Sequence, residues 1–192
     1  MTMKVRNEMF GFLFKKKRLN DIGHKLYSSI IAQSRLTIFY SDLAVEDNLD
    51  GRFDVLALHM SLILDKLDLH GKEENVADLK RILQEIMFDN LDLTLREIGV
   101  GDLGVGKKIK VMAEAFFGRM MVYQDLFRLG DTDKMSKTLH RNLYREKDVS
   151  PDILNYMSIY VFNEHKNVTG QSIDDIMSGV INFTEPEGLT NV

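Results

Sequence analysis

The chain has 192 residues, a formal net charge of −4 and no cysteine. This length fits a single domain, and an apolar fraction of 44% is enough for a sizeable core. The acidic balance gives no whole-protein case for nucleic-acid binding, so we expect no DNA partner. The lack of cysteine excludes disulfides, thiolate metal sites and a cysteine nucleophile.

Apolar residues recur with helical periodicity through most of the chain, which contains only two prolines. This pattern predicts an all-α protein: a single-domain bundle of about six to eight helices. We expect a helical domain over residues 19–182, an N-terminal arm over 1–18 and a flexible tail over 183–192.

The N-terminal arm carries six basic residues and one acid, beside a cluster of aromatic residues. Two interpretations stay open: the arm contacts an anionic membrane surface, or it is solvated and contacts nothing. The residues that would touch the membrane are Phe10, Phe12, Phe14, Lys15, Lys16, Lys17 and Arg18. No secretory signal and no bilayer-spanning run is recognisable. We therefore expect a cytoplasmic protein, with peripheral contact at the cytoplasmic face of the inner membrane as an open alternative.

The first helix of the domain is expected to begin at Asn20. The second begins after Asp50–Gly51 and is apolar nearly all round, which predicts the central buried helix. His59 on this helix is expected to be a core histidine with a satisfied hydrogen bond. A third helix covers about 73–88, and its continuation through Ile98 is left open.

A glycine-rich interhelical loop is predicted at 99–106, followed by a helix over Lys107–Leu129. Asp131 or Asp133 caps the next helix, and Ser150 followed by proline is a typical helix start. Ser172 opens a short last helix.

The glycine-rich loop nearly matches a nucleotide-binding signature. Gly101, Gly106 and Lys107 have Walker A spacing, but Lys108 occupies the position of the Ser or Thr that holds Mg²⁺. The preceding segment is also predicted to be helix and not strand. Nucleotide binding is therefore disfavoured.

Lys107, Lys108 and Lys110 would lie at the start of a helix, where cations oppose the helix dipole. With exposed backbone N–H groups they would attract an anion: a phosphate, a lipid head group, an RNA backbone or a partner's carboxylates. Alternatively they pair with acids of this chain, such as Asp89 or Asp92. A helical domain that binds an anion or small ligand through this loop stays open as an alternative function.

The remaining motifs give no case for catalysis. The five histidines lack metal-ligand spacing, and no nucleophile motif occurs. We therefore expect no cofactor, no metal site and no enzyme.

Several groups of residues resemble one known family when they are taken together. The central group is Asp92, Leu95, Arg96, Glu97, Gly99, Val100, Gly101, Asp102, Leu103, Val105, Lys107, Lys108 and Lys110, followed by Glu114, Ala115, Phe116, Gly118, Arg119 and Tyr123. Earlier groups are Tyr27, Arg35, Phe39 and Tyr40, then Asp50, Gly51, Arg52, Phe53, Leu58 and His59. Over about 20–145 the chain is similar to the ubiquinol–cytochrome c chaperone family.

The resemblance implies an all-α assembly factor for the cytochrome bc1 complex, of the α-proteobacterial type. It implies newly synthesised cytochrome b as partner, and the mitochondrial members also bind near the ribosomal exit tunnel. The residues expected on the partner surface are Arg52, Arg96, Asp102, Lys107, Lys108, Lys110 and Arg119.

Overall fold

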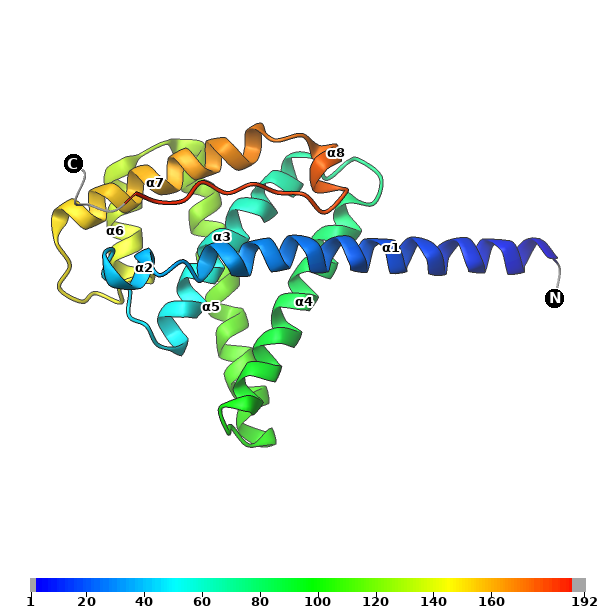
Figure 1. Cartoon of the computed structure of the whole chain (residues 1–192), viewed down its shortest axis with the longest axis horizontal. Helices are drawn as coiled ribbons and strands as arrows, with labels where there is room; N and C mark the ends of the chain where they lie inside the picture. Colours follow the sequence, from blue (N-terminus) through cyan, green and yellow to red (C-terminus); the bar gives the residue numbers. More distant parts are fainter. Residues whose placement is uncertain (1–2, 188–192) are drawn as a thin grey trace.

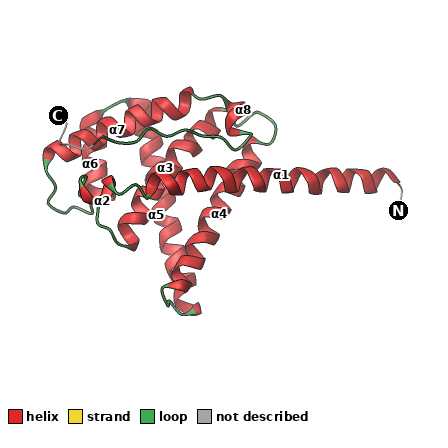
Figure 2. Ribbon diagram, in the orientation of Figure 1, coloured by secondary structure: helices red, strands yellow, loops and turns green. Residues whose placement is uncertain are grey.

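The computed structural model describes residues 3–187, with side chains from Phe14 onward (Figures 1 and 2). Across these residues the chain forms eight helical segments and no β-strand, so the all-α prediction is confirmed. The segments are α1 (Met3–Ser34), α2 (Ile38–Ser41), α3 (Leu49–Leu69), α4 (Val76–Glu97), α5 (Asp102–Leu129), α6 (Thr132–Asn142), α7 (Pro151–Gly170) and α8 (Ile173–Ile176). None of the described helices is both long and apolar enough to cross a membrane.

Helix α3 is the centre of the bundle, as its sequence predicts. It starts where the Asn48 side chain accepts a hydrogen bond from the Gly51 N–H group at 2.8 Å, satisfying one of the free donors of the first turn. From Phe53 to Leu67 every residue is buried. Helices α1, α4, α5 and α7 all pack against it (Figure 1). A helix that is apolar on all sides is stable in water only when neighbours cover it completely.

Helix α1 crosses α4 closely at Gly23, where an added Cβ would lie 2.9 Å from both Ile82 Cγ2 and Ile86 Cδ1. The expected helix start at Asn20 is wrong, because α1 is continuous from Met3. The residues just before Asn20 include lysine, arginine and leucine, which are good helix formers, and no proline interrupts them. Figure 1 shows the first part of α1 extending beyond the body.

Helices α4 and α5 form an antiparallel hairpin whose far end projects from the bundle (Figure 1). Helix α4 continues unbroken through Asn90 to Glu97, and α5 already begins at Asp102. The connection is therefore shorter than the predicted loop at 99–106, and Gly104 and Gly106 are helical. Glycine lowers helix propensity by only about 1 kcal/mol, which the packing of α5 on α3 and α4 outweighs.

The later caps agree with the sequence: the side chains of Asp131, Ser150 and Ser172 each accept a hydrogen bond from the backbone of the following helix. After α8 the chain runs extended alongside α7, between α7 and α1 (Figure 1). We call residues 178–187 the C-terminal strap. The predicted flexible tail at 183–192 overlaps this strap, and within the overlap Gln33 and Glu164 bind the backbone of Thr184.

His59 is a buried core histidine, as expected. Its Nδ1 lies 2.9 Å from the Val55 carbonyl oxygen and its Nε2 lies 2.9 Å from the Tyr160 hydroxyl. Phe39 and Phe183 pack edge-on against the ring. Burial lowers the pKa of His59 to about 4, so the ring is neutral near pH 7.

This burial predicts an acid-sensitive contribution to stability. The unfolded chain protonates His59 near pH 6.5 while the folded chain does so only near pH 4, so stability is lost as the pH falls between these values. Between pH 7 and pH 5 the free energy of unfolding should fall by about 2 kcal/mol more in the native chain than in His59→Gln. Urea titrations at both pH values measure the difference. Equal losses in the two proteins would contradict a neutral, buried ring.

Candidate partner-binding surface

The projecting end of the α4–α5 hairpin is shaped by a glycine. Gly99 has φ of +88°, a conformation that disfavours other residues. Its N–H group donates to the Arg96 carbonyl and the N–H group of Val100 donates to the Leu95 carbonyl, both at 3.0 Å. This arrangement is a Schellman motif, in which the last carbonyls of α4 are satisfied while the chain reverses. Gly101 differs, because its φ of −66° is open to any residue and an added Cβ would meet nothing within 4 Å.

Large apolar side chains are exposed at this end, which we call the hairpin tip (residues 93–111). Leu103 is 92% exposed, and Leu93, Ile98 and Val111 are each more than half exposed. Scattered exposed apolar residues are ordinary, but a group of four at the end of a projecting hairpin is typical of an interaction surface.

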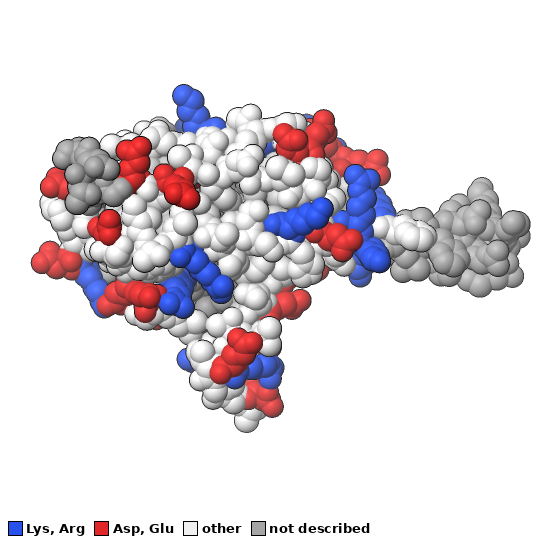
Figure 3. Space-filling model, in the orientation of Figure 1, with Lys and Arg blue, Asp and Glu red and all other residues white. Residues whose placement is uncertain are grey.

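Charged side chains surround these apolar residues. The Arg96 guanidinium pairs with Asp92, with Nε 2.6 Å from Oδ1, and also with Asp102 across the turn. Lys107 and Lys108 are exposed and, among the described residues, have no carboxylate within 4.0 Å. Figure 3 shows acidic and basic side chains together on this projection.

The lysines do not oppose the helix dipole, contrary to the sequence-based expectation. Because α5 begins at Asp102, Lys107 lies in its second turn. The first turn holds Asp102, whose negative charge is favourable there. The expected internal pairing of the lysines with Asp89 or Asp92 is also absent from the ion pairs of the described residues; Lys110 lies 4.0 Å from Glu114. The lysines therefore form an exposed cationic surface.

The exposed apolar surface continues along α5 toward the body. Phe117 and Met121 are exposed one turn apart. Phe117 also packs against Phe116 and Phe88, with ring centroids 5.3 and 6.0 Å away. Aromatic contacts of this kind stabilise the position of the Phe117 ring while part of it stays exposed.

Arg119 differs from the other expected partner residues. Its side chain is only 14% exposed, its Nη2 lies 3.1 Å from Asp54 Oδ1, and its guanidinium stacks over the Phe53 ring. The buried Asp54 also accepts a hydrogen bond from Arg145 Nε at 2.9 Å. Arg145 in turn pairs with Asp50 at 3.0 Å. This network ties α5 and the loop after α6 to the central helix.

Arg52 lies on the exposed side of the first turn of α3, where its Nε is 2.6 Å from Asp47 Oδ1. It lines a cavity of about 330 Å³ between α1, α3 and α4. Apolar residues including Phe53 and Leu91 also line this cavity, and the exposed Ile98 connects it to the hairpin tip.

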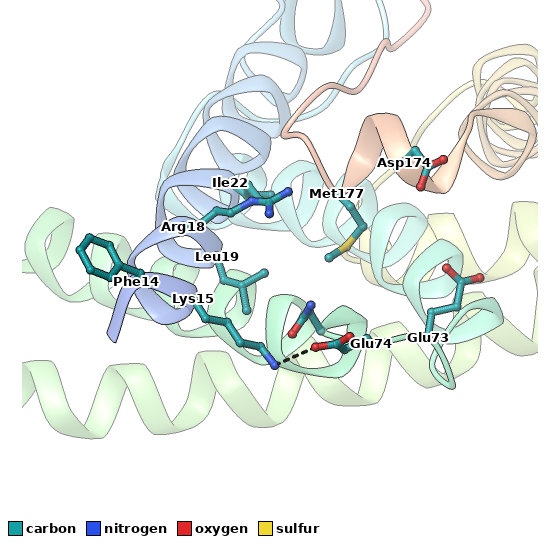
Figure 4. A pocket seen from close by; sticks show the side chains of 10 residues that line it. Phe14, Lys15, Arg18, Leu19, Ile22, Glu73, Glu74, Asp174 and Met177 are labelled. Atoms are coloured by element: carbon teal, nitrogen blue, oxygen red, sulfur yellow. Dashed lines mark hydrogen bonds and ion pairs between the residues drawn. The ribbon is translucent and has the colours of Figure 1, made fainter. Parts of the chain in front are cut away.

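The residues expected at a membrane surface divide into two groups. Phe10 and Phe12 lie outside the described side chains. Phe14 is 70% exposed, and the basic residues 15–18 are exposed beside it. Lys15 and Arg18 line a cavity of about 660 Å³ near Glu73 and Asp174, and Lys15 Nζ lies 3.4 Å from Glu74 (Figure 4).

No group of three His, Asp or Glu side chains within the described part of the chain is arranged to hold a metal ion. The exposed Leu103, Val111 and Met121 are not among the residues predicted on the partner surface, because periodicity alone does not show which face of α5 is left uncovered. The polar residues of α7 that contact the C-terminal strap give no local signal in the sequence either.

Comparison with known proteins agrees with this arrangement. The sequence model of the family described as ubiquinol-cytochrome C chaperone matches residues 41–183. The chain belongs to this family. The chain is also similar to a solved structure described as the Cbp3 homolog from Brucella abortus, with 28% identity and a TM-score of 0.79 over 92% of this chain and 96% of that one. No curated protein sequence matches the chain significantly.

The family match includes α3 to α7 and therefore the whole α4–α5 hairpin. Membership of a chaperone family implies a role other than catalysis. The hairpin tip is accordingly a candidate protein-binding surface.

The two arginines of the hairpin should respond differently to truncation. Arg119→Ala removes one of the two arginines beside the buried Asp54 carboxylate and leaves Arg145 as its partner, which should reduce the free energy of unfolding by about 1–3 kcal/mol. Arg96→Ala removes exposed ion pairs and should cost much less. Chemical denaturation of both variants tests this. Equal losses would mean that Arg119 is not a structural lock.

Proposed function

We propose that the chain is an assembly chaperone for the cytochrome bc1 complex, and that it binds newly made cytochrome b. Membership of the ubiquinol-cytochrome C chaperone family is the observation that carries this proposal. The Cbp3 homolog from Brucella abortus supports it, because it covers nearly the whole chain.

The hairpin tip suits such a client. A subunit that is about to enter a membrane presents apolar segments, which Leu103 and Val111 of the tip can contact, together with Phe117 farther along α5. The surrounding lysines keep this apolar surface soluble and attract acidic loops of the client. In this proposal the exposed residues of the tip recognise the partner, and Arg119 holds α5 in the position that presents them.

A photo-crosslinking amino acid at Leu103 or Val111 should capture cytochrome b during synthesis, because both side chains project from the surface. The same probe at Ile159 on α7 is an exposed apolar control.

Leu103→Glu should weaken client binding about tenfold with little change in thermal stability. Normal bc1 levels in a strain lacking the chain would contradict the proposed function.

Peripheral membrane contact is a second candidate, favoured by the exposed Phe14 beside four basic residues. Phe14→Ser combined with Lys15, Lys16 and Lys17→Gln should reduce sedimentation with phosphatidylserine vesicles, since each lysine near anionic lipid contributes about 1 kcal/mol. Neutral phosphatidylcholine vesicles are the control. Unchanged sedimentation of the variant would remove this segment as the anchor.

A further inference from the structure

The C-terminal strap is bound chiefly through its main chain. The N–H group of Thr184 donates to both carboxylate oxygens of Glu164, at 3.1 and 3.2 Å, and its carbonyl accepts from Gln33 Nε2 at 2.7 Å. The N–H group of Asn182 donates to Gln171 Oε1 at 2.9 Å, and its carbonyl accepts from Gln171 Nε2 at 2.7 Å. The side chains of Gln33, Glu164 and Gln171 thus satisfy four backbone groups of an extended segment, the N–H and carbonyl groups of Asn182 and Thr184.

The side chains that bind the strap offer it a row of hydrogen-bond donors and acceptors, as the backbone at the edge of a β-sheet would. Glu164, Asn167 and Gln171 follow one another at intervals of three and four residues, so they lie on one face of α7. Asn167 adds a bond from its Nδ2 to the Asn182 carbonyl at 3.0 Å. Gln33 reaches the strap from α1. We call these four residues, together with His59, the strap site.

The strap contributes apolar side chains at alternate positions. Ile181 is buried, and the Phe183 ring packs edge-on against His59 with centroids 5.7 Å apart. The side chains of Asn182, Thr184 and Glu185 are exposed. Side chains two residues apart in an extended segment point to the same side. The strap site therefore binds an extended backbone with apolar side chains at i and i+2, while Pro186 of the strap is also buried and the Thr184 hydroxyl lies 3.3 Å from Asn167 Nδ2.

The strap covers the Glu164 carboxylate. Glu164 is 1% exposed with the strap in place, and apart from the strap its carboxylate accepts only from Asn167 Nδ2, at 2.8 Å, among the described residues. When the strap leaves, water or another N–H donor can replace the bonds from Thr184, but only a second extended apolar segment also restores the apolar contacts of Ile181 and Phe183. This favours exchange with a second peptide over simple opening.

We propose that the strap site is a peptide-binding site occupied in cis by residues 178–187, and that an extended apolar segment of a client polypeptide exchanges with the strap there. This inference rests on the proposed chaperone function, because a client that has not yet folded presents such segments. The recognition mode is that of strand addition, in which main-chain hydrogen bonds give affinity and side-chain pockets give selectivity.

The test uses the full chain and a fluorescein-labelled peptide with the sequence of residues 178–187. Thr184→Pro removes the N–H group that donates a hydrogen bond to Glu164, and so should release the strap without altering the strap site. Fluorescence anisotropy should show that this variant binds the peptide about tenfold tighter than the native chain, because the strap no longer competes. Glu185→Ala is the matched control and should behave like the native chain.

Adding Gln171→Ala to Thr184→Pro tests the location of binding. It removes the two bonds between Gln171 and the Asn182 backbone, leaving only the bond from Asn167, and should abolish the gain in affinity. If Thr184→Pro does not fold, as judged by circular dichroism, Phe183→Ala serves as the release variant. Equal peptide binding by native and released chains would overturn the inference. An unchanged affinity after Gln171→Ala would overturn it too.

The client is tested by competition. Unlabelled peptides that tile the cytochrome b sequence should include some that displace the labelled strap peptide from Thr184→Pro. If none does so while a deletion strain lacks the bc1 complex, the exchange inference is wrong and the chaperone function stands. If peptides compete but bc1 levels are normal without the chain, the peptide site stands and the proposed function is wrong.

Discussion

The burial of helix α3 on every side is the constraint on which the rest of the structure depends. A buried helix must place its polar side chains against partners, because an unpaired buried polar group costs free energy. Its buried polar residues include Asp54, His59, Asp65 and Lys66. Each is answered by a different neighbour: the arginines of α5 and of the loop after α6, the Tyr160 hydroxyl, His165 with Arg128, and the Thr169 carbonyl. Each pair therefore joins one neighbouring helix or loop to a particular turn of α3.

The hairpin formed by α4 and α5 combines a fixed base with an exposed end. Near the body, Arg119 is held by Asp54 and Phe53, and Phe116 is buried. Farther out the same helix exposes Leu103 and the lysines to solvent. A rigid base lets an exposed surface keep its shape before a partner arrives, which lowers the ordering cost of binding. The structure therefore separates the locking and recognition roles that the sequence left combined within one stretch.

The C-terminal strap and the hairpin tip offer different chemistry to a client. The hairpin tip presents apolar side chains and cations, whereas the strap site presents donors and acceptors for an extended backbone. The strap site includes Gln33 of α1, and the hairpin tip is formed by the adjoining ends of α4 and α5. Neither contains a residue of the Asp54 network. A chaperone that recognises apolar side chains at one place and backbone at another can hold a chain that has no fixed fold.

The sequence by itself determined the all-α class, the central place of α3 and the capped starts of α6, α7 and α8. Periodicity and capping are local signals, and packing of an apolar helix leaves little choice. Only the tertiary structure decided the length of the turn at Gly99 and the fate of each charge. Arg119 and Lys107 look alike in sequence, yet one faces Asp54 and the other faces water. Burial and pairing depend on which distant helix packs at that point, and the backbone of Asn182 and Thr184 is bound for the same reason: its partners lie on α1, on α7 and at the C-cap of α7.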